Sequence, residues 1–168
     1  MKKFLKTLYN FVFSVEIIAV VLILILNFGP LLFNMRPYVV TSGSMEPAIH
    51  TGSLIYIDLD VKGEDVKEGD VIAFYISESA SATHRVIEVN SDEKYFITQG
   101  DANEFPDFNP VTYDMLIGRT EHAIPYLGYV INWLSTLRGK IIFGCLFLAQ
   151  YILQELFFGE ETEQDEKE

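Results

Sequence analysis

The chain has 168 residues, of which 49% are hydrophobic, and its formal net charge at pH 7 is −12. This length leaves room for one compact domain once the apolar terminal segments are set aside. The acidic balance argues against a nucleic-acid-binding protein, because such proteins need a cationic surface to meet phosphates. The single cysteine, Cys145, excludes an intrachain disulfide and suggests no cysteine-based metal site.

The N-terminal region combines a basic stretch, residues 1–10, with an apolar stretch, residues 11–33, whose only charge is Glu16. As a helix rising about 1.5 Å per residue, residues 11–33 span roughly 34 Å, which exceeds the hydrocarbon core of a bilayer. Because the small-residue cleavage site of a signal peptide does not follow, we expect a retained transmembrane helix. The positive-inside rule then predicts a cell-membrane protein with a cytoplasmic N-terminus and an extracytoplasmic middle, residues 36–138.

The C-terminal region contains a second apolar stretch, residues 141–158, followed by an acidic one, residues 159–168. Gln150, Gln154 and Glu155 make residues 141–158 less apolar than the first stretch. We therefore expect either a second transmembrane helix or an interfacial helix there. Residues 159–168 lack apolar side chains, which predicts a disordered tail.

The polar middle contains short runs of β-forming residues separated by turn residues. We expect a charged loop at 63–69 and a small polar loop at 77–83 that leads to His84. The expected strands are 38–40, 54–57, 70–76, 85–89, 95–98 and 115–124, the last interrupted by Gly118. This pattern predicts a mainly β module, antiparallel or mixed and partly closed, with an N-terminal transmembrane helix and a C-terminal apolar helix.

A serine and a histidine of the middle segment are candidates for nucleophilic chemistry. A serine hydroxyl needs a base to remove its proton, and histidine is the side chain whose ordinary pKa suits that task. Ser44 lies in a turn sequence, and His84 precedes an expected strand; His50 and His122 are the alternative bases. By residue type alone, these residues are equally compatible with a structural turn and surface histidines.

Six blocks follow one another along residues 38–130 and resemble type I signal peptidases. The blocks are 42–47 (SGSMEP), 52–55 (GSLI), 69–72 (GDVI), 84–86 (HRV), 98–101 (TQGD) with Asp107, and 124–128 (IPYLG). The resemblance is closest to the archaeal and endoplasmic-reticulum branch, in which histidine stands where bacterial enzymes use lysine. Lys62, Lys67 and Lys94 lie in charged turns, where we expect them to be solvated.

The resemblance implies a membrane-bound serine endopeptidase that removes signal peptides from secreted preproteins by acyl-enzyme chemistry. At the matching positions, Ser44 is expected to be the nucleophile and His84 the general base. Ser42 is expected to add a hydroxyl to the oxyanion hole beside the Ser44 amide. Preproteins and the lipid bilayer are the expected partners, no cofactor or metal is expected, and partner subunits do not follow from the residues.

The carboxylate block contains two aspartates, and the residues alone do not decide which one faces the base. The resemblance favours Asp107 as the acid that orients His84. Asp101 would then support its loop, pairing with Arg85. Relatives often have Asn-Asn after the first aspartate, whereas this chain has Ala102 and Asn103.

Two other functions fit part of the pattern. One is a self-cleaving repressor-like serine protease, although an apolar helix occupies the place of the DNA-binding segment. The other is a non-catalytic membrane-tethered β scaffold or sensor. Convergence of Ser44, His84 and Asp107 within hydrogen-bonding reach is the feature that separates an enzyme from a scaffold.

Overall fold

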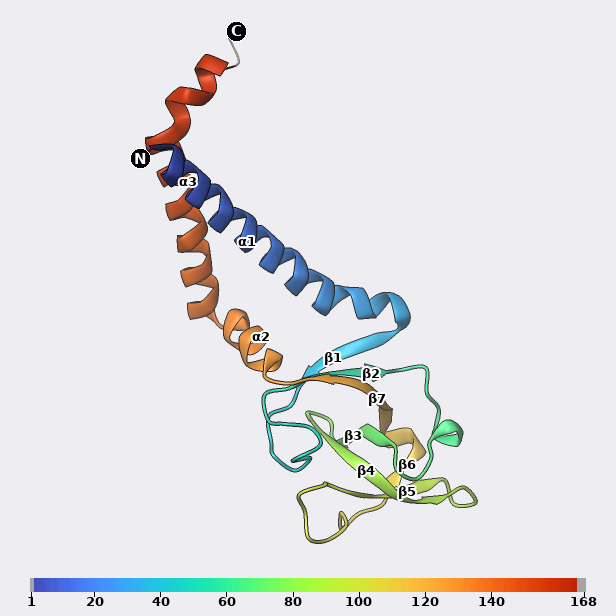
Figure 1. The fold of residues 1–168 in the computed structure, drawn as a ribbon. Coiled ribbons are helices and arrows are strands. Elements are labelled where there is room, and N and C mark those ends of the chain that lie inside the picture. Colours follow the sequence, from blue (N-terminus) through green and yellow to red (C-terminus); the bar gives the residue numbers. More distant parts are fainter. Residues whose placement is uncertain (1, 166–168) are drawn as a thin grey trace. The chain divides into compact units, whose positions relative to one another are not determined.

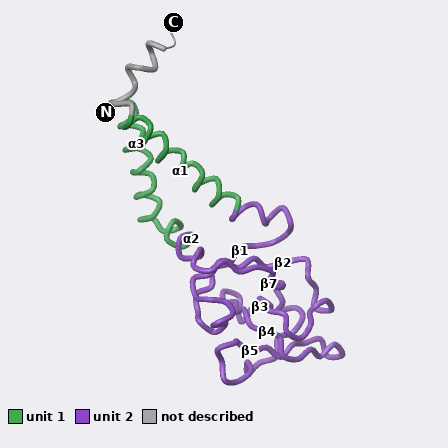
Figure 2. Tube along the Cα trace, viewed as in Figure 1, with its two compact units in different colours: residues 1–25, 131–168 green, residues 26–130 purple. Residues whose placement is uncertain are grey.

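The computed structural model describes residues 2–165, and the chain divides into two compact units. One unit, residues 1–25 with 131–168, contains the long helices, and the other, residues 26–130, contains the β-sheet (Figure 2).

Helix α1 (Lys2–Phe28) is followed by the 3-10 turn η1 (Gly29–Phe33) (Figure 1). Pro30 lies in the first turn of η1, and Asn34 ends it in the left-handed conformation, at φ 53°. The segment Lys6–Phe33 is long and apolar enough to cross a membrane. Its large apolar side chains, such as Ile18 and Ile25, remain exposed, which suits a lipid environment better than water.

The C-terminal helices are α2 (Leu127–Ser135) and α3 (Leu137–Asp165). Among the described residues, Leu127–Ser135 and Leu137–Glu155 satisfy the length and composition of a membrane span only when taken together, with a bend of 86° between them. Tyr9 of α1 donates a hydrogen bond to Gln154 of α3 at 3.0 Å.

Helix α3 begins before and ends after the apolar stretch 141–158 that the sequence indicated. Residues 159–165 are helical rather than disordered, because the run of Glu and Gln after Gly159 consists mostly of good helix formers. Residues 166–168 of the expected disordered tail lie outside the described part of the chain.

The second unit is built on a seven-stranded sheet with strand order β1-β2-β7-β3-β4-β5-β6. Every strand pairing in it is antiparallel. The strands are β1 (Met35–Val39), β2 (Leu54–Asp58), β3 (Val71–Ser77), β4 (Ala80–Asn90), β5 (Tyr95–Gln99), β6 (Val111–Thr112) and β7 (Leu116–Ile124). The prediction of an antiparallel module is confirmed, whereas partial closure is wrong, because the sheet is open with β1 and β6 at its edges.

Strand β4 begins at Ala80, inside the segment 77–83 that was expected to be a loop. Only Glu78 and Ser79 separate it from β3, and Ala82 and Thr83 pair with residues of β3. Small polar side chains weaken a strand prediction without preventing backbone pairing, since the ladder is formed by main-chain groups. Strand β6 has two residues and is therefore too short for a periodic signal.

Two groups of buried side chains form the core of this unit. The first surrounds Phe96, Ile72 and Val86, and the second includes Met45, Ile49, Ile55, Ile57 and Ala73. Met45 immediately follows Ser44 and is only 2% exposed. Burial of this side chain therefore fixes the position of the neighbouring serine.

Candidate active site

Ser44 lies at the start of a compact turn that Met45 and Ile49 anchor in the core. Glu46 N–H donates to the Gly43 carbonyl at 3.0 Å, and Ile49 N–H donates to the Met45 carbonyl at 2.8 Å. Two backbone hydrogen bonds and two buried side chains thus hold the turn that carries Ser44 in place.

The side chain of Glu46 stabilises the same turn through contacts with His50 and Thr51. Its carboxylate accepts the Thr51 N–H at 2.9 Å and lies 2.6 Å from His50 Nδ1. The Thr51 N–H, followed by His50, lowers the pKa of Glu46. His50 also stacks on Tyr126, with ring centroids 5.8 Å apart. This alternative base therefore contacts Glu46 and Tyr126 rather than Ser44.

The other alternative base, His122, lies in β7 opposite Tyr56 of β2. It has no hydrogen bond to Ser44. Lys62, Lys67 and Lys94 are likewise absent from the residues that line the cleft beside Ser44.

His84 of β4 lies between Ser44 and Asp107. Its Nε2 is 3.1 Å from Ser44 Oγ, and its Nδ1 is 2.6 Å from Asp107 Oδ2. An ionised carboxylate can only accept, so Nδ1 donates to Asp107 and Nε2 is left to accept the serine proton. The imidazole and the Phe74 ring pack in a T-shaped arrangement, with ring centroids 6.1 Å apart.

Asp107 is held by Thr98, a residue whose role the sequence alone does not indicate. The Thr98 hydroxyl donates to Asp107 Oδ2 at 2.6 Å, and the Asp107 N–H donates to the Thr98 carbonyl at 2.8 Å. Thr98 is the penultimate residue of β5 and precedes Gly100 and Asp101, and this position was the available signal. A single threonine in a strand does not reveal where its hydroxyl points.

Asp101 makes different contacts and faces Arg85. The Arg85 guanidinium donates from Nε and Nη2 to the two Asp101 oxygens, at 2.8 and 2.7 Å, and from Nη1 to the Gly69 carbonyl at 2.8 Å. The Asp101 carboxylate raises the pKa of Arg85. Asp101 therefore ties its loop to β4, whereas Asp107 is the aspartate hydrogen-bonded to His84.

The loop after β5 also contacts the backbone of the nucleophile candidate. Ala102 N–H donates to the Ser44 carbonyl at 2.9 Å. A Cβ on Gly100 would lie 2.6 Å from the same carbonyl oxygen, so only glycine allows this approach. The loop that carries Asp107 thus also supports the backbone of Ser44.

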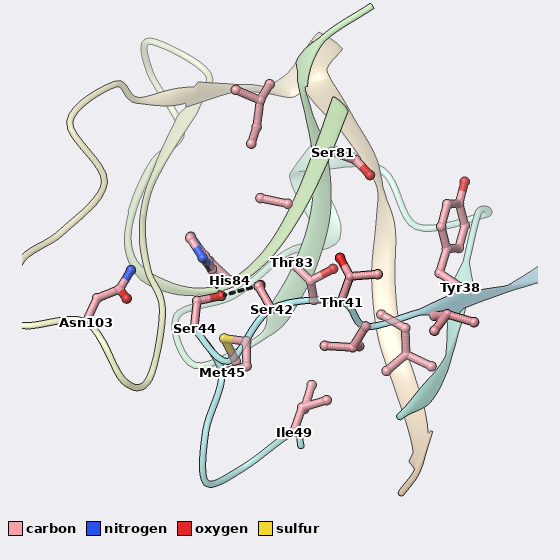
Figure 3. A pocket seen from close by; sticks show the side chains of 15 residues that line it. Tyr38, Thr41, Ser42, Ser44, Met45, Ile49, Ser81, Thr83, His84 and Asn103 are labelled. Atoms are coloured by element: carbon pink, nitrogen blue, oxygen red, sulfur yellow. Dashed lines mark hydrogen bonds between the residues drawn. The ribbon is translucent and has the colours of Figure 1, made fainter. Parts of the chain in front are cut away.

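A cleft of about 480 Å³ opens beside Ser44 and His84 (Figure 3). One wall is formed by the stretch from Tyr38 to Ser42, and the other by Ser81–Thr83 of β4. Residues 81–83 pair with β3 alone, because the pairing of β4 with β5 begins at Arg85. The cleft therefore runs along a free strand edge, with Met45, Ile49 and Ile55 among the apolar residues that line it.

Two hydrogen-bond donors lie near the Ser44 hydroxyl. Ser42 Oγ is 3.4 Å from Ser44 Oγ (Figure 3). Among the described residues, none accepts a hydrogen bond from the Ser44 N–H. The Ser44 N–H is thus unoccupied among the described residues, and the Ser42 hydroxyl lies beside the Ser44 hydroxyl. The side chains that the structure describes include no group of three or more His, Cys, Asp or Glu arranged to hold a metal ion.

The family model described as "Signal peptidase, peptidase S26" matches residues 13–96, which is half of the chain. The chain belongs to the peptidase S26 family of signal peptidases. The family that the six sequence blocks predicted is therefore confirmed.

Curated relatives agree with this membership. Signal peptidase I W of Bacillus subtilis (strain 168) is 32% identical over 117 residues, which cover 67% of this chain and 62% of the relative. The human signal peptidase complex catalytic subunit SEC11C is 35% identical over 104 residues, which cover 55% and 53% of the two chains. The matched part is thus between a half and two thirds of the length of these relatives.

Proposed function

We propose that this chain is a membrane-bound serine endopeptidase that removes signal peptides from secreted preproteins through an acyl-enzyme. The hydrogen-bond chain from Ser44 through His84 to Asp107, at the mouth of a cleft, is the observation that carries the proposal. The names of the relatives, signal peptidase I and catalytic subunit of the signal peptidase complex, support the choice of substrate.

In the proposed mechanism, His84 Nε2 removes the proton from Ser44 as the hydroxyl attacks the scissile carbonyl. Asp107 holds the ring in the required tautomer and stabilises the imidazolium that forms. The Ser44 N–H and the Ser42 hydroxyl donate to the oxyanion of the tetrahedral intermediate. The C–N bond then breaks, the leaving amine takes the proton from His84, and a water activated by His84 hydrolyses the ester on Ser44.

The free edge of β4 offers a physical basis for binding an extended peptide. A substrate strand laid between Tyr38–Ser42 and Ser81–Thr83 would hydrogen-bond to main-chain groups on the edge of residues 81–83 that faces away from β3. Alternate substrate side chains would point toward the apolar side of the cleft, near Met45 and Ile49. The family resemblance implies that small side chains fill these positions.

The apolar segment Lys6–Phe33 supports a membrane anchor, and the lysines that precede it support a cytoplasmic N-terminus. The β module would then lie on the extracytoplasmic side of the cell membrane. Signal peptides are themselves apolar segments in the membrane. Confining enzyme and substrate to one membrane therefore raises their effective concentration without any additional contact.

The test is cleavage of a precursor that carries a signal peptide by the full chain in detergent or liposomes. Wild type should produce the mature protein, and Ser44→Ala should lose at least about 10⁴-fold in rate. Ser91→Ala is the matched control, because Ser91 is exposed in the turn after β4, and it should retain wild-type activity. Equal cleavage by wild type and Ser44→Ala, or none by wild type, would contradict the proposal.

A further inference from the structure

We propose that Thr98 is a positioning residue for this reaction, which holds the Asp107 carboxylate in the orientation that His84 requires. This inference rests on the proposed roles of Ser44, His84 and Asp107. Thr98 itself does not line the cleft, so it would act only through the aspartate.

The contacts between Thr98 and Asp107 fix the aspartate at two points. The Thr98 hydroxyl and His84 Nδ1 both lie 2.6 Å from the same oxygen, Asp107 Oδ2. The Thr98 carbonyl accepts the Asp107 N–H at 2.8 Å. One residue therefore holds both the backbone and the side chain of the acid, and the hydroxyl bond sets the rotation of the carboxylate.

The sheet explains why Thr98 can do this. Thr98 of β5 pairs with Val86 of β4, and His84 is two residues from Val86, on the same face of β4. The hydroxyl is thus carried by a strand paired in register with the strand that carries the imidazole. Thr98 is fully buried, at 0% exposure, so solvent cannot take the place of this hydroxyl.

Asp107 lies in a segment that needs such an anchor. The residues between β5 and β6 form turns and bends without a regular backbone ladder. The aromatic residues on either side of the aspartate do not pack into the core, since Phe105 is 75% exposed and Phe108 is 98% exposed. Hydrogen bonds, rather than burial of its neighbours, therefore determine where the carboxylate points.

The hydrogen bond from Thr98 to Asp107 is not explained by the need of a buried hydroxyl for an acceptor. Thr120 of β7 has a buried Oγ1 without a hydrogen-bond partner among the described residues. The fold thus tolerates a buried threonine hydroxyl with no acceptor. Thr120→Val is accordingly a matched control, because it removes a buried threonine hydroxyl that contacts neither Ser44 nor His84.

The experiment compares Thr98→Val and Thr98→Ser in the full chain, each also combined with Asp107→Ala. Thr98→Val should lower kcat for precursor cleavage about 10- to 100-fold, as expected for a lost hydrogen bond to a charged group, with KM unchanged. Thr98→Ser should retain most of the activity, and Thr120→Val should match wild type. On the Asp107→Ala background, Thr98→Val should cause no further loss, because its effect passes through the aspartate.

A second readout does not depend on the physiological substrate. A fluorophosphonate probe forms a P–O bond to Ser44 and loses fluoride, while His84 takes the serine proton. The rate of this labelling reports activation of the nucleophile, and Thr98→Val should slow it by a similar factor. If Thr98→Val fails to give a cooperative thermal transition, Thr98→Ala replaces it, with the same expected loss and the same rescue by serine.

The outcomes separate this inference from the proposed function. Labelling of Ser44 in wild type without precursor cleavage would contradict the substrate assignment, while the inference would still be decided by labelling of the Thr98 variants. Equal labelling of wild type and Thr98→Val would overturn the inference, whatever the precursor result. An equal loss from Thr98→Val with and without Asp107 would also overturn it, because a purely structural role predicts that result.

Discussion

Replacing Gly100 by alanine should displace Ser44, the proposed nucleophile, without touching any reacting group. Gly100 lies against the Ser44 carbonyl, which also accepts the Ala102 N–H at 2.9 Å. The Cβ of an alanine would lie 2.6 Å from that carbonyl oxygen and 2.8 Å from Asn103 Nδ2. The Asn103 side chain can rotate away, whereas the Ser44 carbonyl is part of the backbone of the turn that carries the proposed nucleophile.

The size of the displacement follows from these distances. An ordinary contact begins at 3.4 Å, so the loop and the turn must separate by up to about 0.8 Å to relieve the overlap. A misplacement of about 1 Å can cost roughly 100-fold in rate when the reacting atoms are pre-aligned. Because the loop can absorb part of the movement, we expect kcat of Gly100→Ala to fall by about 10- to 100-fold.

The assay is kcat and KM for precursor cleavage, with thermal unfolding recorded for each variant. Gly144→Ala is the control, because a Cβ at Gly144 would meet no atom within 4 Å. That variant should keep wild-type kinetics and should stabilise α3 by up to about 1 kcal/mol. Wild-type kcat in a folded Gly100→Ala protein would refute the inference that this loop fixes the position of Ser44.

Three further predictions concern the acids and the core. Asp107→Asn should lower kcat by about 10⁴-fold, whereas Asp101→Asn, which weakens a loop contact, should cost at most about 100-fold; steady-state kinetics distinguishes them. The Thr51 N–H lowers the pKa of Glu46 below its ordinary value of 4.5. The ionised carboxylate therefore stabilises the fold above pH 4.5, and this contribution is lost as the pH falls through the lowered pKa. Urea unfolding of Glu46→Gln should therefore show a smaller loss of stability than wild type between about pH 5 and about pH 3. Phe96→Ala, at a position with 0% exposure, should lower the free energy of unfolding by about 3 to 5 kcal/mol, and a loss below about 1 kcal/mol would contradict the assigned core.

The strands that the sequence predicted best are those bounded by strong turn signals. Leu54–Ile57 and Tyr95–Thr98 are each within one residue of the observed strands, since alternating or β-branched side chains coincide there with turns on both sides. The start of β4 was wrong because Ala80–Thr83 are small residues whose strand conformation comes from pairing with β3. That pairing is a tertiary effect and leaves no pattern in the local sequence.

The candidate site was predictable in its residue types but not in all of its contacts. Ser44 and His84 are 40 residues apart, and it was the order of family-like blocks, rather than spacing, that connected them. The resemblance also favoured Asp107 over Asp101 as the acid, and this choice stays a prediction; in the structure His84 is hydrogen-bonded to Asp107, and Arg85 to Asp101. Thr98 was missed because only the register of β5 against β4 reveals where its hydroxyl points.

The most direct test of the account is to trap the covalent intermediate. Wild-type protein is mixed with precursor, quenched in acid within the first turnover, digested, and analysed by mass spectrometry. We predict an ester that joins the carboxyl end of the signal peptide to Ser44, and no such ester in His84→Ala. An acyl group on a different residue, or precursor cleavage by wild type that leaves Ser44 unmodified at every quench time, would contradict the account.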